Sequence, residues 1–414
     1  MRIGLTLVFM LFCSGLWAQT DDAKRLYQGY QDSIYQIRII EKGSGNKASI
    51  GSGFLLGQQG HVVSNYHVVA DAVNKPDRYL IEYLDARGQK GQLQLLTVDV
   101  VHDLALLKAS DIQRSGFTLQ QGTLAKGIRL FSLGNPHDLG MTVVEGTYNG
   151  LVDGSFYERI LFSGSLNPGM SGGPTINREG EVIGVNVATA GNQISFLVPV
   201  DYLHALLSQA NENEPISDWD ALLEQQLQAN QAQILDQLLK EPWKMEPLGD
   251  ARVAAEIAQY VKCWGDTDDN EKYLYQVTHR VCQMEESIYV GGNFSTGVFR
   301  YEYQWYESNK LNLVQFYSQM EDGFYIDQAN DAGEDNVTPY ECNEQFVESV
   351  GKNWKAHLCV RRYKKYPALM DVSLSMASLL NKRTGLVANF SIAGVDQTNA
   401  RRITQRFMES MQWN

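Results

Sequence analysis

Positive charge, long apolar runs and cysteine are all scarce in this sequence of 414 residues. Lys and Arg number 35 against 48 Asp and Glu, and the net charge of -13 argues against a broad nucleic-acid-binding surface. Beyond the first residues, no stretch has the apolar length of a transmembrane helix. With 44% hydrophobic and 20% charged residues and no low-complexity tract, the chain is neither wholly disordered nor fibrous. Its length predicts two or three globular domains.

The only long apolar run lies at the amino terminus and has the form of a secretory signal. Arg2 precedes a mostly apolar stretch at residues 3–12, which is too short to span a membrane as a mature helix. We expect a signal peptide at residues 1–18, cleaved after Ala18, so that Cys13 is removed and no stable membrane span remains. An uncleaved amino-terminal anchor is the alternative.

Cysteine is absent from residues 19–262, and four cysteines follow that stretch. An even number in an exported chain predicts two disulfides, with three possible pairings. The simplest pairing joins sequence neighbours, Cys263 with Cys282 and Cys342 with Cys359. Because none of these cysteines forms a CxxC pair, we expect no zinc site, and nothing else in the sequence calls for a metal or a cofactor.

The first half of the chain is rich in short β-runs punctuated by glycine, a pattern typical of a barrel or a sandwich. A short helix at residues 201–209 is expected to close this unit, and a polar linker follows at residues 211–216. Ser217 and Asp220 resemble a capping box ahead of a helix that Pro242 ends. That helix is either a coiled-coil-like partner helix or, as we favour, a connector packed on its own domain. The β-runs lie at residues 33–40, 50–56, 61–65, 104–108, 130–134, 142–147, 182–188 and 194–198.

From about residue 250 the pattern is that of an α+β unit. An Ala-rich helix is expected at residues 250–260, and apolar residues alternate with polar ones at residues 299–305, 370–376 and 388–392, which indicates strands. A last helix is expected to be capped near Asp396, with Ala400, Ile403, Phe407 and Met411 on one face.

The most unusual local sequence surrounds Ser171 in residues 167–174, where glycines flank a serine. Such a segment can be a loop that needs positive φ. It can also present a nucleophile, because small neighbours let a substrate carbonyl reach the Ser171 hydroxyl while the backbone N–H groups of Gly169 and Ser171 bind the oxyanion that forms.

A serine nucleophile needs a base, and the base needs an orienting acid. His67 directly follows the β-run at residues 61–65, where a strand gives way to a turn or a helix. Asp103 begins the apolar run at residues 104–108, so its carboxylate is expected to be buried and therefore paired. Asp99 is the nearest competitor for this role.

Together these motifs resemble the chymotrypsin-fold serine proteases, particularly their HtrA (Deg-type) branch, over about residues 30–205. The resembling residues are Gly51-Ser52-Gly53-Phe54, Asn65-Tyr66-His67-Val68, Asp103-Leu104-Ala105-Leu106-Leu107, Gly134-Asn135-Pro136, Gly169-Met170-Ser171-Gly172-Gly173 and Gly184-Val185-Asn186. The resemblance implies two six-stranded β-barrels, a catalytic triad of His67, Asp103 and Ser171 in the cleft between them, and an oxyanion hole at Gly169 and Ser171. It also favours a bacterial source and a periplasmic or extracellular location.

The sequence departs from that family at several positions. Met170 stands where the family usually has Asn, Pro168 where it has Arg or a similar residue, and no peptide-binding PDZ domain is recognisable after residue 210. Ser165 stands where trypsin-type enzymes carry Asp, so a preference for Lys or Arg is not supported. Leu197 replaces a common Ala in a strand that resembles the one pairing with substrate backbone, so we expect cleavage after small or medium apolar residues. The candidate substrate-binding residues are Ser165, Ile194, Ser195, Phe196 and Leu197.

The sequence therefore predicts an exported serine endopeptidase that acts on polypeptides through an acyl-enzyme. The alternative is a latent or non-enzymatic binding or sensor protein on a protease fold, whose carboxyl-terminal domain recruits a protein partner. The expected architecture is a signal peptide at residues 1–18, a chymotrypsin-like double barrel at 19–209, a linker and connecting helix at 210–245, and a disulfide-containing α+β domain of unknown role at 246–414.

Overall fold

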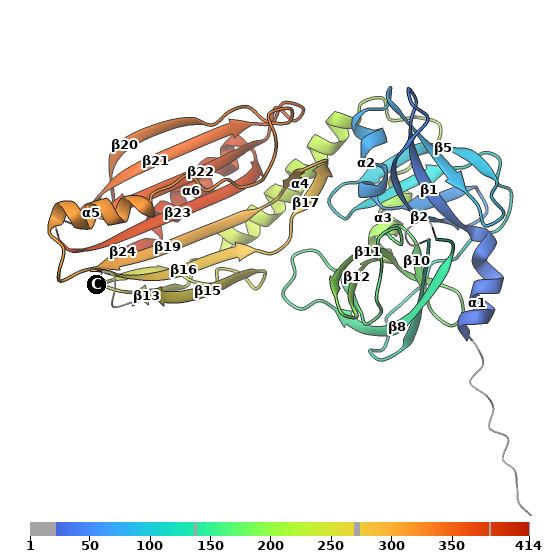
Figure 1. Ribbon diagram of the computed structural model, residues 1–414, viewed down its shortest axis with the longest axis horizontal. Coiled ribbons are helices and arrows are strands. Elements are labelled where there is room, and N and C mark those ends of the chain that lie inside the picture. Colours follow the sequence, from blue (N-terminus) through green and yellow to red (C-terminus); the bar gives the residue numbers. More distant parts are fainter. Residues whose placement is uncertain (1–21, 136–138, 269–273, 381, 414) are drawn as a thin grey trace, which may run out of the picture.

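The computed structural model describes residues 22–135, 139–268, 274–380 and 382–413, so the expected signal peptide and Pro136 lie outside the described residues. Two closed six-stranded antiparallel barrels come first along the chain, and a β-rich region follows them (Figure 1). The double barrel implied by the family resemblance is confirmed. None of the described helices is long and apolar enough to cross a membrane.

Helix α1 (Asp22–Tyr30) precedes the first barrel, whose strands are joined in the order β1-β2-β3-β6-β5-β4. Its interior is apolar because alternate strand residues such as Ile37 and Ile39 point inward and are fully buried. Helix α2 (Tyr66–Asn74) follows β3 directly and packs against the barrel wall. The strands are β1 (Ile34–Glu41), β2 (Lys47–Leu56), β3 (His61–Ser64), β4 (Tyr79–Leu84), β5 (Lys90–Asp99) and β6 (Leu104–Lys108).

The second barrel has the strand order β10-β11-β12-β9-β8-β7, and α3 (Val200–Gln209) closes it as expected. Two of its strands, β9 and β10, have only three residues each. The strands are β7 (Arg129–Gly134), β8 (Thr142–Leu151), β9 (Ile160–Phe162), β10 (Pro174–Ile176), β11 (Val182–Gly191) and β12 (Ile194–Pro199).

Helix α4 (Trp219–Lys240) leaves the barrels as a connector, but it packs against both α2 of the first barrel and the carboxyl-terminal sheet, and not on a single domain. Its buried face includes Leu223, Leu227 and Ile234, which join an apolar core shared with α2 and with the carboxyl-terminal sheet. The expected capping box is one residue out of register, because the helix is capped by Asp218, whose carboxylate accepts a hydrogen bond from Ala221 N.

The carboxyl-terminal region is built on a seven-stranded antiparallel sheet with the order β15-β16-β19-β23-β22-β21-β20. Each edge strand is fastened to its neighbour by a disulfide between directly opposed residues, Cys263–Cys282 and Cys342–Cys359. The simplest of the three possible pairings, which joins sequence neighbours, is thus the one observed. The strands are β15 (Val261–Asp268), β16 (Gln276–Met284), β19 (Phe299–Glu307), β23 (Thr384–Val395), β22 (Met370–Ser378), β21 (Lys352–Arg362) and β20 (Glu341–Ser349).

Two expectations for this region are wrong. Residues 250–260 contain no helix, because Ala251–Ala254 forms β14 between β13 (Met245–Leu248) and β24 (Met411–Trp413). Pairing on both sides and burial of Ala251 and Val253 override the helix preference of alanine. Met411 belongs to β24 and not to the last helix, α6 (Gln397–Glu409), which Asp396 caps as expected.

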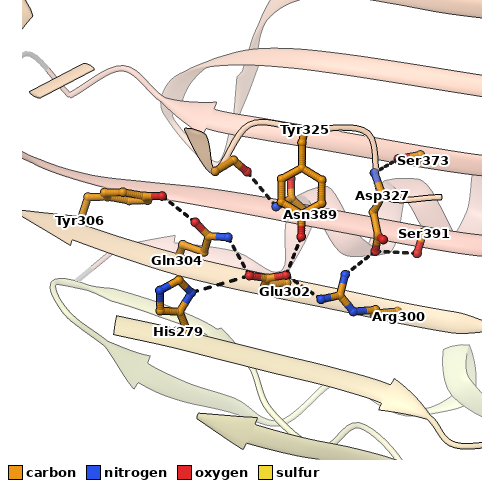
Figure 2. A network of polar contacts seen from close by, with 11 residues as sticks. His279, Arg300, Glu302, Gln304, Tyr306, Tyr325, Asp327, Ser373, Asn389 and Ser391 are labelled. Carbon is orange, nitrogen blue, oxygen red and sulfur yellow. Dashed lines mark hydrogen bonds and ion pairs between the residues drawn. The ribbon is translucent and has the colours of Figure 1, made fainter. Parts of the chain in front are cut away.

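The two faces of the large sheet differ in polarity. Tyr301, Tyr303 and Phe390 on one face pack against Phe407 of α6 in an aromatic cluster. The opposite face carries a polar network centred on Glu302, and the segment after α5 (Leu313–Asp322) lies over it (Figure 2). A small hairpin of β17 (Ile288–Gly291) and β18 (Phe294–Thr296) extends from the sheet and packs on α2 of the first barrel.

Candidate active site

His67 and Asp103 meet because the strands next to them pair. Strands β3 and β6 place Ser64 opposite Ala105, which brings the start of α2 beside the residue that precedes β6. The Asp103 carboxylate accepts two hydrogen bonds from His67, one from the backbone N at 2.8 Å and one from Nδ1 at 2.6 Å. One side chain thus fixes both the backbone and the imidazole of His67, leaving Nε2 for another partner.

Asp103 adopts an unusual backbone conformation at this position, with φ of 61°. Asp and Asn enter this left-handed region more readily than other non-glycine residues. Asn65, which is fully buried, donates from Nδ2 to the Asp103 carbonyl oxygen at 2.8 Å and holds this turn in place. The Asn65-Tyr66-His67 motif therefore supplies both the histidine and the support for its acid.

The pKa of His67 is raised above its ordinary value of 6.5. Burial acts in the opposite direction, because it disfavours the charged imidazolium. The negative charge of Asp103 and its hydrogen bond outweigh burial and stabilise the cation. The imidazole is therefore a stronger base than an isolated histidine.

Asp99, the competing acid, has a different partner. Its carboxylate accepts hydrogen bonds from His102 N at 3.0 Å and from His102 Nδ1 at 2.7 Å. The His102 ring in turn stacks on Tyr202, with ring centroids 3.7 Å apart. The geometry therefore separates two His–Asp pairs, and only the pair of His67 and Asp103 lies at the start of α2.

Ser171 sits in the tight turn between β9 and β10, and Ser52 of β2 holds that turn. Ser52 Oγ donates to the Gly169 carbonyl at 2.6 Å, and Ser52 N donates to the Ser171 carbonyl at 2.7 Å. The same Ser52 Oγ accepts from Asn135 N at 2.9 Å. Three of the sequence motifs thus converge on one loop, which joins the two barrels at this point.

Asn186 of β11 holds the loop from the other side. This fully buried side chain donates from Nδ2 to the Met170 carbonyl at 3.1 Å, and its Oδ1 accepts from Ser132 and Thr175 at 2.8 and 2.6 Å. Ser52 and Asn186 belong to the motifs found in the sequence, but the sequence alone gives neither residue a role. Only the paired strands show that both support the serine loop.

Glycine is required in this loop for two separate reasons. Gly169 has φ of 95°, a conformation that side chains disfavour. A Cβ on Gly172 would lie 2.2 Å from the Ser52 carbonyl oxygen, so no larger residue fits without a shift of backbone. Among the described residues, the N–H groups of Gly169 and Ser171 donate to no protein acceptor, which leaves both available for an oxyanion.

The Ser171 hydroxyl itself points elsewhere in this structure. Its Oγ donates to the Val187 carbonyl of β11 at 3.5 Å, and within the described part of the chain no hydrogen bond joins it to His67. Hydrogen bonds between a nucleophile and its base are often long or poorly aligned when no substrate is bound.

The candidate substrate-binding residues are divided between the surface and the core. Ser165 and Ile194 are exposed, whereas Leu197 is fully buried among apolar neighbours that include Leu166 and Met170. Ser195 is buried and accepts a hydrogen bond from Leu166 N at 3.2 Å. Phe196 is half-buried and lines a cavity that also contacts Asp103.

Part of this chain is similar to known proteins. Residues 51–185 match the trypsin-like peptidase domain. The mitochondrial serine protease HTRA2 of Drosophila pseudoobscura pseudoobscura is 32% identical over 203 residues, which cover 44% of this chain and 46% of that protein. The chloroplastic protease Do-like 5 of Arabidopsis thaliana is 30% identical over 210 residues, 42% of this chain and 65% of that protein.

Among solved structures, the crystal structure of Deg5 aligns with a TM-score of 0.40 and 26% identity, covering 47% of this chain and 95% of that one. The chain spans about half the length of the curated HTRA2 relatives that it matches. The family match at residues 51–185 lies within the two barrels and does not reach the carboxyl-terminal region. Residues 51–185 thus match the trypsin-like peptidase domain, and over 44% of its length the chain is similar to a serine protease of the HtrA type.

Proposed function

We propose that this protein is an exported serine endopeptidase that hydrolyses peptide bonds through an acyl-enzyme. The observation that carries the proposal is the pair of hydrogen bonds by which Asp103 fixes the backbone and the ring of His67. The adjacent serine loop has two backbone N–H groups, of Gly169 and Ser171, that donate to no acceptor among the described residues. Homology to serine proteases of the HtrA and Deg type supports the same reaction class.

In the proposed reaction, His67 Nε2 takes the proton of Ser171 Oγ as the oxygen attacks the carbonyl carbon of the substrate. The resulting oxyanion accepts hydrogen bonds from the N–H groups of Gly169 and Ser171. His67 then gives the proton to the leaving amine nitrogen, the C–N bond breaks, and the acyl group stays on Ser171. A water molecule, deprotonated by His67, releases the acid product and restores the serine.

We propose that the protein is exported and acts in the periplasm or outside the cell. Two disulfides in the carboxyl-terminal region support it, because such bonds persist in oxidising compartments. The apolar segment at residues 3–12 supports it from the sequence side.

Cleavage is proposed to follow small or medium apolar residues. The fully buried side chains of Met170 and Leu197, with Leu166 beside them, occupy space next to the serine loop. Ser165 stands where trypsin-type enzymes carry Asp, so that position offers no carboxylate to bind Lys or Arg. A cleavage profile from a peptide library that is dominated by basic or acidic residues would contradict this specificity.

A latent or non-enzymatic protein is the second candidate, favoured by the hydrogen bond of Ser171 Oγ to Val187 in place of His67. The two candidates are separated by incubating the purified protein with unfolded casein and identifying new amino termini by mass spectrometry. The endopeptidase proposal expects new termini that are absent with Ser171→Ala. Intact casein with well-folded protein would support the second candidate.

A further inference from the structure

A cavity of about 420 Å³ lies beside Asp103, and both the peptidase domain and the carboxyl-terminal region line it. The peptidase side contributes Val100 and Val101 before the acid, together with Val187 and Ala188 of β11. The carboxyl-terminal side contributes Tyr260, Lys262 and the segment of residues 285–289. Clefts at such boundaries are a common place for ligand sites.

The cavity adjoins the proposed catalytic centre. Asp103, which orients His67, is one of its lining residues, and so is Val187, whose carbonyl accepts from Ser171 Oγ at 3.5 Å. Phe196 lines it from β12, in the segment expected to contact substrate backbone. A polypeptide whose carbonyl group reaches Ser171 and whose chain follows these strands therefore brings a neighbouring side chain to the cavity.

Specific contacts hold the carboxyl-terminal wall of the cavity in place. The Glu286 carboxylate accepts hydrogen bonds from the Ser155 hydroxyl and from the backbone N–H groups of Phe156 and Tyr157, the latter two at 3.1 and 3.4 Å. On the other flank, Tyr66 Oη donates to the Val290 carbonyl at 2.6 Å. The first contact fastens the loop between β8 and β9, and the second fastens α2, so the cavity is preformed.

The lining chemistry indicates the kind of side chain that fits. Valine, alanine, isoleucine and aromatic side chains make up much of the wall, whereas charges of both signs lie among them. Arg159 and Lys262 face Asp153 and Glu285. The other two carboxylates, Asp103 and Glu286, are already engaged by His67 and by backbone N–H groups, so the remaining charges balance. An apolar side chain is therefore the best match.

We propose that this cavity is a substrate subsite completed by the carboxyl-terminal region, which selects polypeptides with an aromatic or branched aliphatic side chain near the scissile bond. The inference rests on the proposed endopeptidase function and extends it, because Tyr260, Lys262 and residues 285–289 then help to determine specificity. The carboxyl-terminal region is in this view part of the substrate-binding surface of the enzyme.

The test uses the full mature chain and a positional library of tetrapeptide amides with a fluorogenic leaving group. We expect a position other than the one directly before the scissile bond to favour aromatic or branched aliphatic residues over glycine by about ten-fold or more in kcat/KM. Ser287 is exposed and lines the cavity, so Ser287→Trp adds bulk there at little risk to folding. This variant is expected to abolish the preference, so that the ratio of aromatic to glycine substrate falls towards one.

Asn293→Trp is the matched control. Asn293 is exposed in the turn of the β17–β18 hairpin, which follows Ser287 directly, and it does not line the cavity. It is expected to keep the wild-type preference. A library without any apolar preference at these positions, or an equal preference in Ser287→Trp and wild type, would overturn the subsite. If the wild-type protein cleaves no library member at all, the endopeptidase function itself fails, which is a different outcome.

Discussion

At the scale of single residues, the proposed chemistry depends on a carboxylate in a strained position. Asp103 has positive φ and binds both the backbone and the ring of His67. Strain of this kind is concentrated at functional sites, where the surrounding structure maintains it. Here the support comes from Asn65, which binds the Asp103 carbonyl.

Asp103→Asn is predicted to lower kcat/KM by about 10³–10⁴-fold while leaving the fold intact, because Asn tolerates the same backbone conformation. Burial opposes the charged form of His67, but Asp103 raises its pKa above the ordinary value. Wild-type activity should therefore fall as the pH is lowered, and this loss should begin at a higher pH than for an ordinary histidine. Without the Asp103 charge, burial lowers this pKa, and the acid limb of the kcat/KM profile moves to lower pH.

The pH dependence of kcat/KM checks this prediction, with Asp99→Asn as the control. Asp99 binds His102 and not His67, so its variant should keep the wild-type acid limb. An acid limb that stays in place in Asp103→Asn would mean that another group controls the titration.

The sequence could single out His67, Asp103 and Ser171 as candidates because each lies in a short motif, and these motifs follow one another in a distinctive order. It could not reveal the roles of Ser52 and Asn186, since their partners lie far away in sequence and meet them only through strand pairing. The orientation of the Ser171 hydroxyl depends on a single side-chain torsion, which no sequence pattern encodes.

At the scale of elements, strands with clear alternation or apolar runs were predictable, and irregular ones were not. Strand β5 begins with exposed polar residues, and β9 and β10 are too short to show a period. The Ala-rich segment that forms β14 has the composition of a helix. Its strand conformation comes from pairing with β13 and β24, and β24 lies far away in the sequence, so the local pattern does not predict it.

The large sheet also carries a buried charge that its neighbours stabilise. Burial opposes ionisation of Glu302, but His279 Nδ1 at 3.7 Å, hydrogen bonds from Gln304 and Tyr325, and the Arg300 charge lower its pKa to about 2 (Figure 2). A lowered pKa contributes stability above the ordinary value of 4.5, and this contribution is lost as the pH falls towards 2.

Glu302→Gln is therefore predicted to reduce the free energy of unfolding by about 2 kcal/mol at neutral pH. The difference from wild type should shrink as the pH falls through the range between 4.5 and about 2. Denaturant unfolding at several pH values measures this, and Glu348→Gln on the exposed edge strand β20 is a control that should change little. A difference in unfolding free energy that grows as the pH falls would contradict an ionised Glu302 in the folded protein.

At the scale of the whole molecule, the carboxyl-terminal region and the first barrel share one apolar core. Polar contacts reinforce this union next to the proposed active site. Gln226 of α4 accepts from Val100 N at 2.9 Å and donates to the Val98 carbonyl at 2.7 Å, just before Asp103. The connector thus holds the segment that presents the acid.

Gln226→Ala should remove both hydrogen bonds and lower the local stability of this segment by about 1–2 kcal/mol. Amide hydrogen exchange at Val100 is then expected to accelerate by about ten-fold, since 1.4 kcal/mol corresponds to that factor. Gln225→Ala, at the exposed neighbouring position, should leave the exchange rate unchanged. Equal exchange in both variants would show that α4 does not stabilise the segment.

The most direct test of the account is reaction of the purified full-length mature protein with a fluorophosphonate, followed by mass spectrometry of the modified peptide. The account predicts a covalent adduct on Ser171 that is absent in Ser171→Ala and strongly slowed in His67→Ala, because the hydroxyl needs the imidazole as its base. Folded protein that forms no adduct would contradict an activated serine and would favour the non-enzymatic alternative.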